Sequence, residues 1–164
     1  MIKLLVIKDY EPLSNTILSS LELITKSDNP KINILFDSGF VKNLLENFQF
    51  FDDEKLEKII LILSNLSHKK EIEGLLNQIA LELINLLKLN KKTEIQIHCL
   101  EGIYSIIQSP FSVGLIDYLN NMGCKEIIEN FSINCKNETV LNKVITLKNY
   151  MAEINDLEIE NHVN

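Results

Sequence analysis

Residues 59–66, Ile59-Ile60-Leu61-Ile62-Leu63-Ser64-Asn65-Leu66, decide the fold class of this chain. Ile59, Ile62, Leu63 and Leu66 follow the i, i+3, i+4, i+7 spacing, which places them on one face of an α-helix. Alternation of apolar and polar residues, the pattern of a half-buried strand, never runs long enough in this chain to predict one. The stretch therefore predicts an amphipathic helix that packs its apolar face against other helices.

The same helical spacing recurs along the chain in both directions from this stretch. The apolar sets are Val41, Leu44, Leu45 and Phe48; Ile79, Leu83, Leu86 and Leu87; Ile103, Ile106 and Ile107; and Val140, Val144 and Leu147. Only three prolines and five glycines interrupt these patterns. We therefore expect an all-α protein.

Composition and charge narrow the class of protein further. With 164 residues, 46% hydrophobic and 24% charged, the chain fits a single domain over residues 1–164 with a core of its own. The net charge of −7 argues against a general nucleic-acid binder, because phosphate contacts require clustered basic residues. No apolar run is long enough to span a bilayer. We expect protein partners, and neither nucleic acid nor membrane.

The residues that usually carry catalysis or bind metals form no recognisable pattern. The three histidines, His68, His98 and His162, are scattered, and Cys124 and Cys135 lack the short paired spacing of zinc sites. Glycine-rich phosphate loops and the G-x-S-x-G and H-E-x-x-H motifs are missing from the sequence. The sequence predicts no catalytic residue, no metal site and no cofactor, and thus a protein that is not an enzyme.

Polar residues and glycines separate the expected helices. Asp37-Ser38-Gly39 ends one helix and starts another, and Gly123 forms a similar joint. Thr93 and Asn137 are candidate N-caps for the helices that follow them. The acidic residues Asp52, Asp53, Glu54 and Glu57 have two interpretations: they steer a basic peptide, or they form a solvated helix start that the helix dipole favours.

Three segments of the chain share one layout, which predicts an internal repeat. Each has a small-residue joint, a helix of about a dozen residues, a polar turn and a longer helix, and the segments start about 40 residues apart. Short helices at about 30–36, 69–76 and 110–119 complete three helices per unit. We expect an armadillo/HEAT-like right-handed α-solenoid of about three to four three-helix repeats. Its parts are a partial repeat 1–36, repeats 37–76, 77–120 and 121–155, and an acidic tail 156–164.

Two stretches carry a resemblance to a known family. Phe36-Asp37-Ser38-Gly39-Phe40-Val41-Lys42-Asn43-Leu44-Leu45 resembles the start of an armadillo second helix, and Ile62-Leu63-Ser64-Asn65-Leu66-Ser67 resembles the end of a third helix. Within the armadillo-repeat family, the chain is most similar to the C-terminal repeats of the importin alpha subunits. There the last repeats read like Leu100-Glu101-Gly102-Ile103 followed by Asn137-Glu138-Thr139-Val140-Leu141-Asn142-Lys143. The likeness covers about residues 13–155.

The resemblance implies a protein-binding groove on the concave face. In that family a Trp on the third helix packs on lysine stems of a basic nuclear localisation peptide, and an Asn four residues later binds the peptide backbone. Asn65 matches the Asn and Leu61 takes the place of the Trp, while Glu101 and Ser105 match this pair in the next unit. The chain has no Trp. Asn65 also has a structural interpretation, in which its side chain satisfies backbone groups near the helix end.

The function implied is that of an adaptor in nuclear protein import, found in cytoplasm and nucleus, which binds cargo or the export receptor. Two alternatives stand beside it. Armadillo-type nucleotide exchange factors grip the ATPase domain of the Hsp70 chaperone with a similar solenoid. In the second alternative, the chain is a structural subunit of a larger complex. In each case we expect a monomer or one subunit of a complex, bound to protein partners.

Overall fold

The computed structural model describes residues 11–26, 32–89, 91–112 and 114–163, with side chains from Pro12 to Ile154 within those ranges. Every regular element in this part of the chain is a helix. The elements are α2 (Glu11–Lys26), α3 (Asn33–Asp37), α4 (Phe40–Glu46), the 3₁₀ helix η3 (Phe48–Phe50), α5 (Asp53–Leu66), the 3₁₀ helix η4 (Lys70–Leu75), α6 (Leu76–Lys88), α7 (Thr93–Ile107), α8 (Leu115–Asn121), α9 (Cys124–Asn134) and α10 (Glu138–Val163). The prediction of an all-α protein is confirmed.

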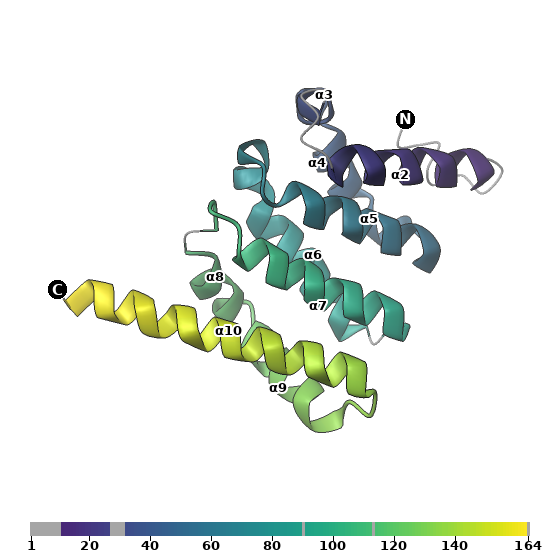
Figure 1. Ribbon diagram of the computed structural model, residues 1–164. Coiled ribbons are helices and arrows are strands. Elements are labelled where there is room, and N and C mark those ends of the chain that lie inside the picture. Colours follow the sequence, from purple (N-terminus) through teal and green to yellow (C-terminus); the bar gives the residue numbers. More distant parts are fainter. Residues whose placement is uncertain (1–10, 27–31, 90, 113, 164) are drawn as a thin grey trace.

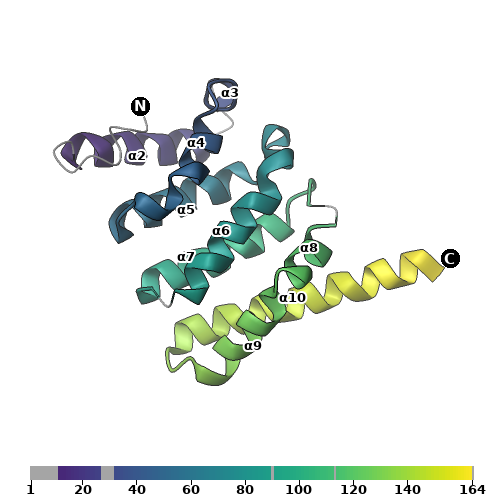
Figure 2. The same ribbon diagram turned by 180° about the vertical axis from the view of Figure 1, so that it is seen from behind.

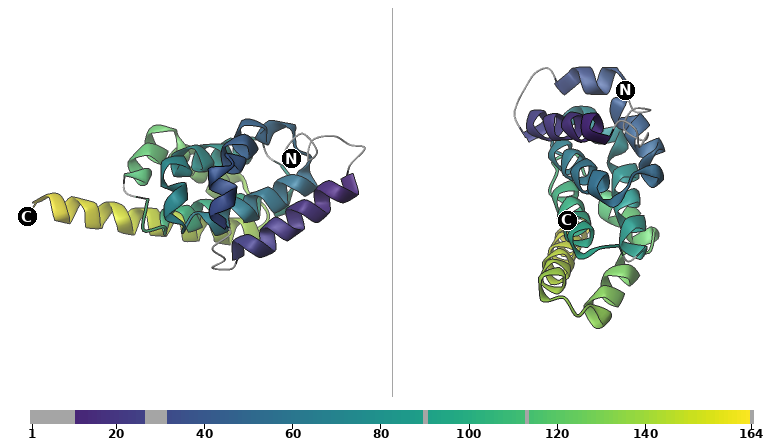
Figure 3. Two further views of the ribbon diagram at one scale, coloured as in Figure 1. Left: turned by 90° about the horizontal axis from the view of Figure 1, so that it is seen from above. Right: turned by 90° about the vertical axis from the view of Figure 1, so that its right-hand side faces the viewer.

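The helices form two layers. The four long helices α2, α5, α7 and α10 lie side by side in one row, in that order (Figure 1). Helices α4, α6, α8 and α9 lie behind this row and form the second layer (Figure 2). Helix α7 packs on both α5 and α6, and α10 packs on both α7 and α9, so the two layers share one interior. Figure 3 shows the two layers from the side.

The core lies between the layers and consists of the apolar faces that the sequence predicts. Ile59, Ile62, Leu63 and Leu66 of α5 are fully buried. The corresponding residues of the other helices are buried as well: Leu44 and Leu45 of α4, Ile79 and Leu83 of α6, Ile103 and Ile106 of α7, and Val140, Val144 and Leu147 of α10. Burial of one such side chain contributes about 1.5–3 kcal/mol. The helical spacing of these residues is therefore the main source of the fold.

Helix α7 approaches its neighbours closely at Gly102. A Cβ atom on Gly102 would lie 2.9 Å from Leu83 Cδ1 of α6 and 3.6 Å from Ile60 Cγ2 of α5. The missing side chain thus lets three helices meet at one point of the core.

Glycines form two of the predicted joints. Gly39 lies between α3 and α4 with φ of 66°, and Gly123 lies between α8 and α9 with φ of 78°. Side chains other than glycine rarely adopt these left-handed angles. The chain therefore turns sharply at both places, as the sequence predicts.

The helix starts agree with two sequence patterns and differ from a third. Asp52 caps α5, because its Oδ1 accepts a hydrogen bond of 3.0 Å from the Lys55 amide. Asn137 caps α10 through a 3.1 Å hydrogen bond from the Val140 amide to its Oδ1. The prediction for Thr93 is wrong. Helix α7 already begins at Thr93, and the N-cap residue is Lys92, which has no side-chain oxygen to accept a capping hydrogen bond.

Residues 156–163 of the predicted acidic tail are not separate from the last helix. Helix α10 continues through this segment to Val163. Residues 138–163 contain no Pro or Gly, and Glu, Leu, Lys and Ala support a helix without packing. The last part of α10 extends beyond the other helices (Figures 1 and 3).

Side chains connect neighbouring helices of the row at a nearly constant separation in sequence. The hydrogen-bonded pairs lie 37 to 42 residues apart and join Asn15 to Glu54, Asn65 to Thr25, Lys91 to Asp53, Ser105 to His68, and Ser109 to Ser67. Equivalent positions of α2 and α5, and of α5 and α7 with the residues just outside their ends, therefore lie next to each other.

The short elements expected between the long helices are present. The helix expected at 69–76 is the 3₁₀ helix η4, and the one at 110–119 is α8, which starts later, at Leu115. The one at 30–36 corresponds to α3, from Asn33. Residues 1–10 and 27–31 of the predicted partial repeat lie outside the described residues, and the boundaries of the four units stay predictions.

Candidate functional site

The four residues that the sequence singles out lie on two neighbouring helices of the row. Leu61 and Asn65 are on α5, and Glu101 and Ser105 are on α7. All four are partly exposed, because the core-facing positions of each helix lie on its opposite side. Within each pair the residues are one helical turn apart and project to the same side. The structure thus places them on one face, the outer face of the row.

Asn65 connects α5 to α2. Its Nδ2 donates a hydrogen bond of 3.3 Å to Thr25 Oγ1, and the Thr25 hydroxyl in turn donates to the Glu22 carbonyl at 3.0 Å. Thr25 is buried. The Asn65 side chain therefore has a structural partner, but this partner is a side-chain hydroxyl of a neighbouring helix and not a backbone group at the end of α5, while the residue remains partly exposed on the outer face.

Ser105 belongs to a polar network between α7 and the end of α5. Its hydroxyl lies 3.2 Å from Ser67 Oγ, 3.1 Å from His68 Nε2 and 3.4 Å from the Ser64 carbonyl oxygen. The Ser109 hydroxyl, two residues beyond the end of α7, donates to the Ser67 carbonyl at 2.6 Å and extends the network. These contacts add hydrogen bonds to the carbonyl groups of Ser64 and of Ser67, the C-cap residue of α5, at the end of the helix where the regular backbone hydrogen bonds stop.

Glu101 connects α7 to α10. Its Oε1 lies 2.7 Å from the Lys143 ammonium, and both side chains are 42% exposed. Its Oε2 lies 3.6 Å from His98 Nδ1, which is too far for a hydrogen bond, and this nitrogen is buried without a hydrogen-bond partner among the described residues. Exposed pairs of this kind stabilise a fold by about 1 kcal/mol at most, so Glu101 retains the freedom to bind another cation.

The outer face carries an aromatic pair that the sequence analysis missed. The rings of Tyr104 on α7 and Tyr150 on α10 lie 5.0 Å apart at 57°. Both residues are half-buried and pack on the core. Tyr104 lies one turn from Glu101, and Tyr150 lies two turns from Lys143. The contact between the two rings could not be predicted from the sequence, because it depends on α7 and α10 being neighbours.

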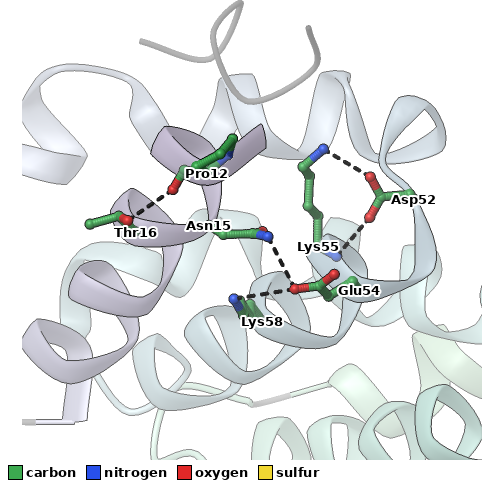
Figure 4. Close-up of polar contacts among 7 residues, drawn as sticks. All are labelled: Pro12, Asn15, Thr16, Asp52, Glu54, Lys55 and Lys58. Atoms are coloured by element: carbon green, nitrogen blue, oxygen red, sulfur yellow. Dashed lines mark hydrogen bonds and ion pairs between the residues drawn. The ribbon is translucent and has the colours of Figure 1, made fainter. Parts of the chain in front are cut away.

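Lysines neutralise most of the acidic residues at the start of α5. Asp52 pairs with Lys55, Asp53 with Lys91 and Lys92, and Glu54 with Lys58. Glu54 also accepts a 3.1 Å hydrogen bond from Asn15 of α2 (Figure 4). These contacts favour the interpretation of this acidic set as a helix start. The remaining member, Glu57, has no ion pair among the described residues.

Two cavities lie away from the four predicted residues. The larger, of about 720 Å³, lies between the end of α6, the start of α7, and α9 with the loop that follows it. The smaller, of about 370 Å³, lies between α8, α9 and α10. Neither is lined by Leu61, Asn65, Glu101 or Ser105. No short motif marks either cavity, because its lining comes from separate segments of the chain.

Among the described residues, no three His, Cys, Asp or Glu side chains come together in a way that could hold a metal ion. In the same part of the chain, no helix has both the length and the apolar character needed to cross a bilayer.

Comparison with models of known protein families, with curated proteins and with solved structures gives no match.

Proposed function

We propose that the chain is a protein-binding module of armadillo type, a right-handed α-solenoid of about three to four three-helix units, which binds an extended segment of a partner protein across the row of long helices. The observation that carries this proposal is the regular row α2, α5, α7, α10, whose neighbours are joined by side chains 37 to 42 residues apart. Stacked units of about 40 residues have this property.

The geometry of the row suits an extended peptide. Neighbouring helices pack about 8–10 Å apart, and an extended chain rises about 3.3 Å per residue. A peptide that crosses the row therefore meets a new helix with about every third residue. Leu61 and Asn65 on α5, followed by Glu101 and Ser105 on α7, offer it alternating apolar, amide, acidic and hydroxyl contacts.

Charge favours a basic partner. The chain carries a net charge of −7, and Glu57 of α5 and Glu94 of α7 have no ion pair among the described residues. Together with the resemblance to the importin alpha subunits, this makes a lysine-rich nuclear localisation peptide the first ligand to test. The specific role would be an adaptor of nuclear import, in cytoplasm and nucleus. The chain has no Trp, so Leu61 would supply the apolar surface for a lysine stem.

A titration of the full chain against a fluorescent lysine-rich localisation peptide tests this proposal. We expect micromolar binding that weakens as salt rises, because exposed charges are screened. Glu101→Gln should reduce the affinity several-fold and Asn65→Ala about tenfold, which corresponds to about 1.4 kcal/mol. Glu126→Gln is the matched control, because it also removes one carboxylate, from an exposed side chain of α9 in the second layer.

The outcomes separate binding from folding. Denaturant unfolding of each variant shows whether a weaker affinity reflects a less stable protein, since Asn65 and Glu101 also hold neighbouring helices together. An equal loss in Glu101→Gln and Glu126→Gln would mean that only the overall charge attracts the peptide. No binding at low salt would contradict the proposal for this class of ligand.

A further inference from the structure

The larger cavity has a lining that differs from the rest of the protein. Its walls include three lysines, Lys88 at the end of α6, Lys91 in the next loop and Lys136 after α9, and no carboxylate. The chain as a whole has 23 acidic and 16 basic residues. A cavity that collects three cations in an acidic protein creates a local positive potential, which favours an anion.

Two of these lysines are available to a ligand. Lys88 and Lys136 are exposed and have no ion pair among the described residues. Lys91 is different, because its ammonium lies 3.1 Å from Asp53 Oδ1 of α5. The buried side chain of Gln96 donates a 2.9 Å hydrogen bond to the Lys91 carbonyl and holds this loop at the edge of the cavity.

The start of α7 adds to the positive character of the same wall. Helix α7 begins at Thr93, which lines the cavity, and Lys92 gives it no side-chain cap. The amide groups of a first helical turn have no partner within the helix and carry partial positive charge. Phosphate groups bind well at such a place, and lysine ammonium groups bind them as point charges.

The opposite wall combines apolar side chains with amide side chains. Phe131 and Ile127 of α9 line it and are half-buried, and Asn130 and Asn134 of the same helix lie beside them. The volume of about 720 Å³ is much larger than a phosphate ion and lies within the range of sites for small organic ligands. The ligand therefore combines anionic groups with a flat or apolar part that carries hydrogen-bonding atoms.

We propose that this cavity binds an organic phosphate of nucleotide size, with its phosphate groups between Lys88, Lys136 and the start of α7, and its ring against Phe131. This site is independent of the peptide-binding face, which lies on the outer side of the row. Either proposal stands if the other fails.

A fluorescent ATP analogue, titrated into the full chain at physiological salt, tests the proposal. The chain has no Trp, so the fluorescence of the label is read without a strong protein background. We expect saturable binding that unlabelled ATP and inorganic tripolyphosphate reverse and adenosine does not. The double variant Lys88→Gln/Lys136→Gln should weaken binding at least tenfold.

A second double variant provides the control. Lys125→Gln/Lys148→Gln also removes two exposed lysines, but these line the smaller cavity between α8, α9 and α10. It should leave the affinity unchanged. An equal loss in both double variants, or no saturable binding in the wild type, would overturn the proposal. Circular dichroism of both variants confirms that each is folded.

The place of the ring is tested separately with Phe131→Leu, which keeps an apolar side chain at this position. The variant should weaken the binding of ATP several-fold and leave that of tripolyphosphate unchanged. If ATP and tripolyphosphate lose affinity equally, or if neither does, the ring does not lie against Phe131 and this part of the proposal is wrong.

Discussion

Lys55 shows how a single charged side chain can become part of the fold. Only 4% of this side chain is exposed, and its ammonium lies 2.8 Å from Asp52 Oδ2. Burial on its own raises the pKa of Asp52, but the hydrogen bonds from the Lys55 side chain and backbone, together with the lysine charge, hold this pKa below 3.8. The ionised carboxylate therefore stabilises the folded state, because a buried ammonium without a counter-charge is costly.

Replacing Asp52 by Asn should lower the free energy of unfolding at neutral pH by about 1 kcal/mol, a modest value because Asp52 itself is half exposed. The Asn oxygen can still cap α5, so the loss measures the charge. Since the folded pKa is lowered, the contribution is complete above pH 3.8 and disappears as the pH falls through the folded pKa. Urea unfolding at successively lower pH measures this. Glu57→Gln is the control, and a loss independent of pH would contradict the explanation.

The three cysteines should differ in reactivity. Burial raises the pKa of Cys99 to about 12 and that of Cys124 to about 12, the latter against a small opposing effect of Lys88. Cys135 is partly exposed. Because the thiolate is the reactive form, a disulfide reagent at mildly alkaline pH should modify Cys135 rapidly and the other two only after denaturation. Rapid reaction of Cys135→Ser would show that the buried thiols open to solvent.

At the scale of the helix, Gly102 limits how closely α7 can pack. Alanine at this position favours the helix by about 1 kcal/mol, but its Cβ would lie 2.9 Å from the fully buried Leu83. Overpacking in a core costs about 1–3 kcal/mol. We expect Gly102→Ala to lower the free energy of unfolding by about 1 kcal/mol. Gly74→Ala has open space around it and should not be destabilising. A stabilised Gly102→Ala variant would mean that Leu83 moves freely.

The helices were predictable because apolar residues recur with the helical period in the sequence, and these residues, such as Ile59, Ile62 and Leu63 of α5, are the ones that the fold buries. Asn137 was predictable as a cap because its contact is local. The last part of α10 was not, because its apolar pattern fades before the helix ends. The partners of Asn65 and Glu101 and the lysine-lined cavity required knowledge of which helices are neighbours. Local patterns therefore predict elements, and contacts between them determine the site.

At the scale of the whole molecule, the row of helices has a middle and two ends. Helix α5 packs between α2 and α7, and α7 packs on α5, α6 and α10. Helix α2 packs mainly on α5, and the last part of α10 extends beyond the other helices. An amide exchanges with solvent when the structure around it opens, and opening is easiest where few buried contacts hold a helix. Stability should therefore fall from the middle of the row toward its ends.

Amide hydrogen exchange followed by mass spectrometry measures this gradient. We expect α5 and α7 to exchange most slowly, α2 faster, and the end of α10 fastest. Asn65→Ala removes the hydrogen bond between α5 and α2, so it should lower the opening free energy of α2 by about 0.5–1.5 kcal/mol and leave α10 unchanged. Lys143→Gln, which removes the ion pair between α7 and α10, should affect α10 and not α2. If all four long helices exchange at one rate in each variant, the molecule opens only as a whole, and a row of locally coupled helices is the wrong description of its stability.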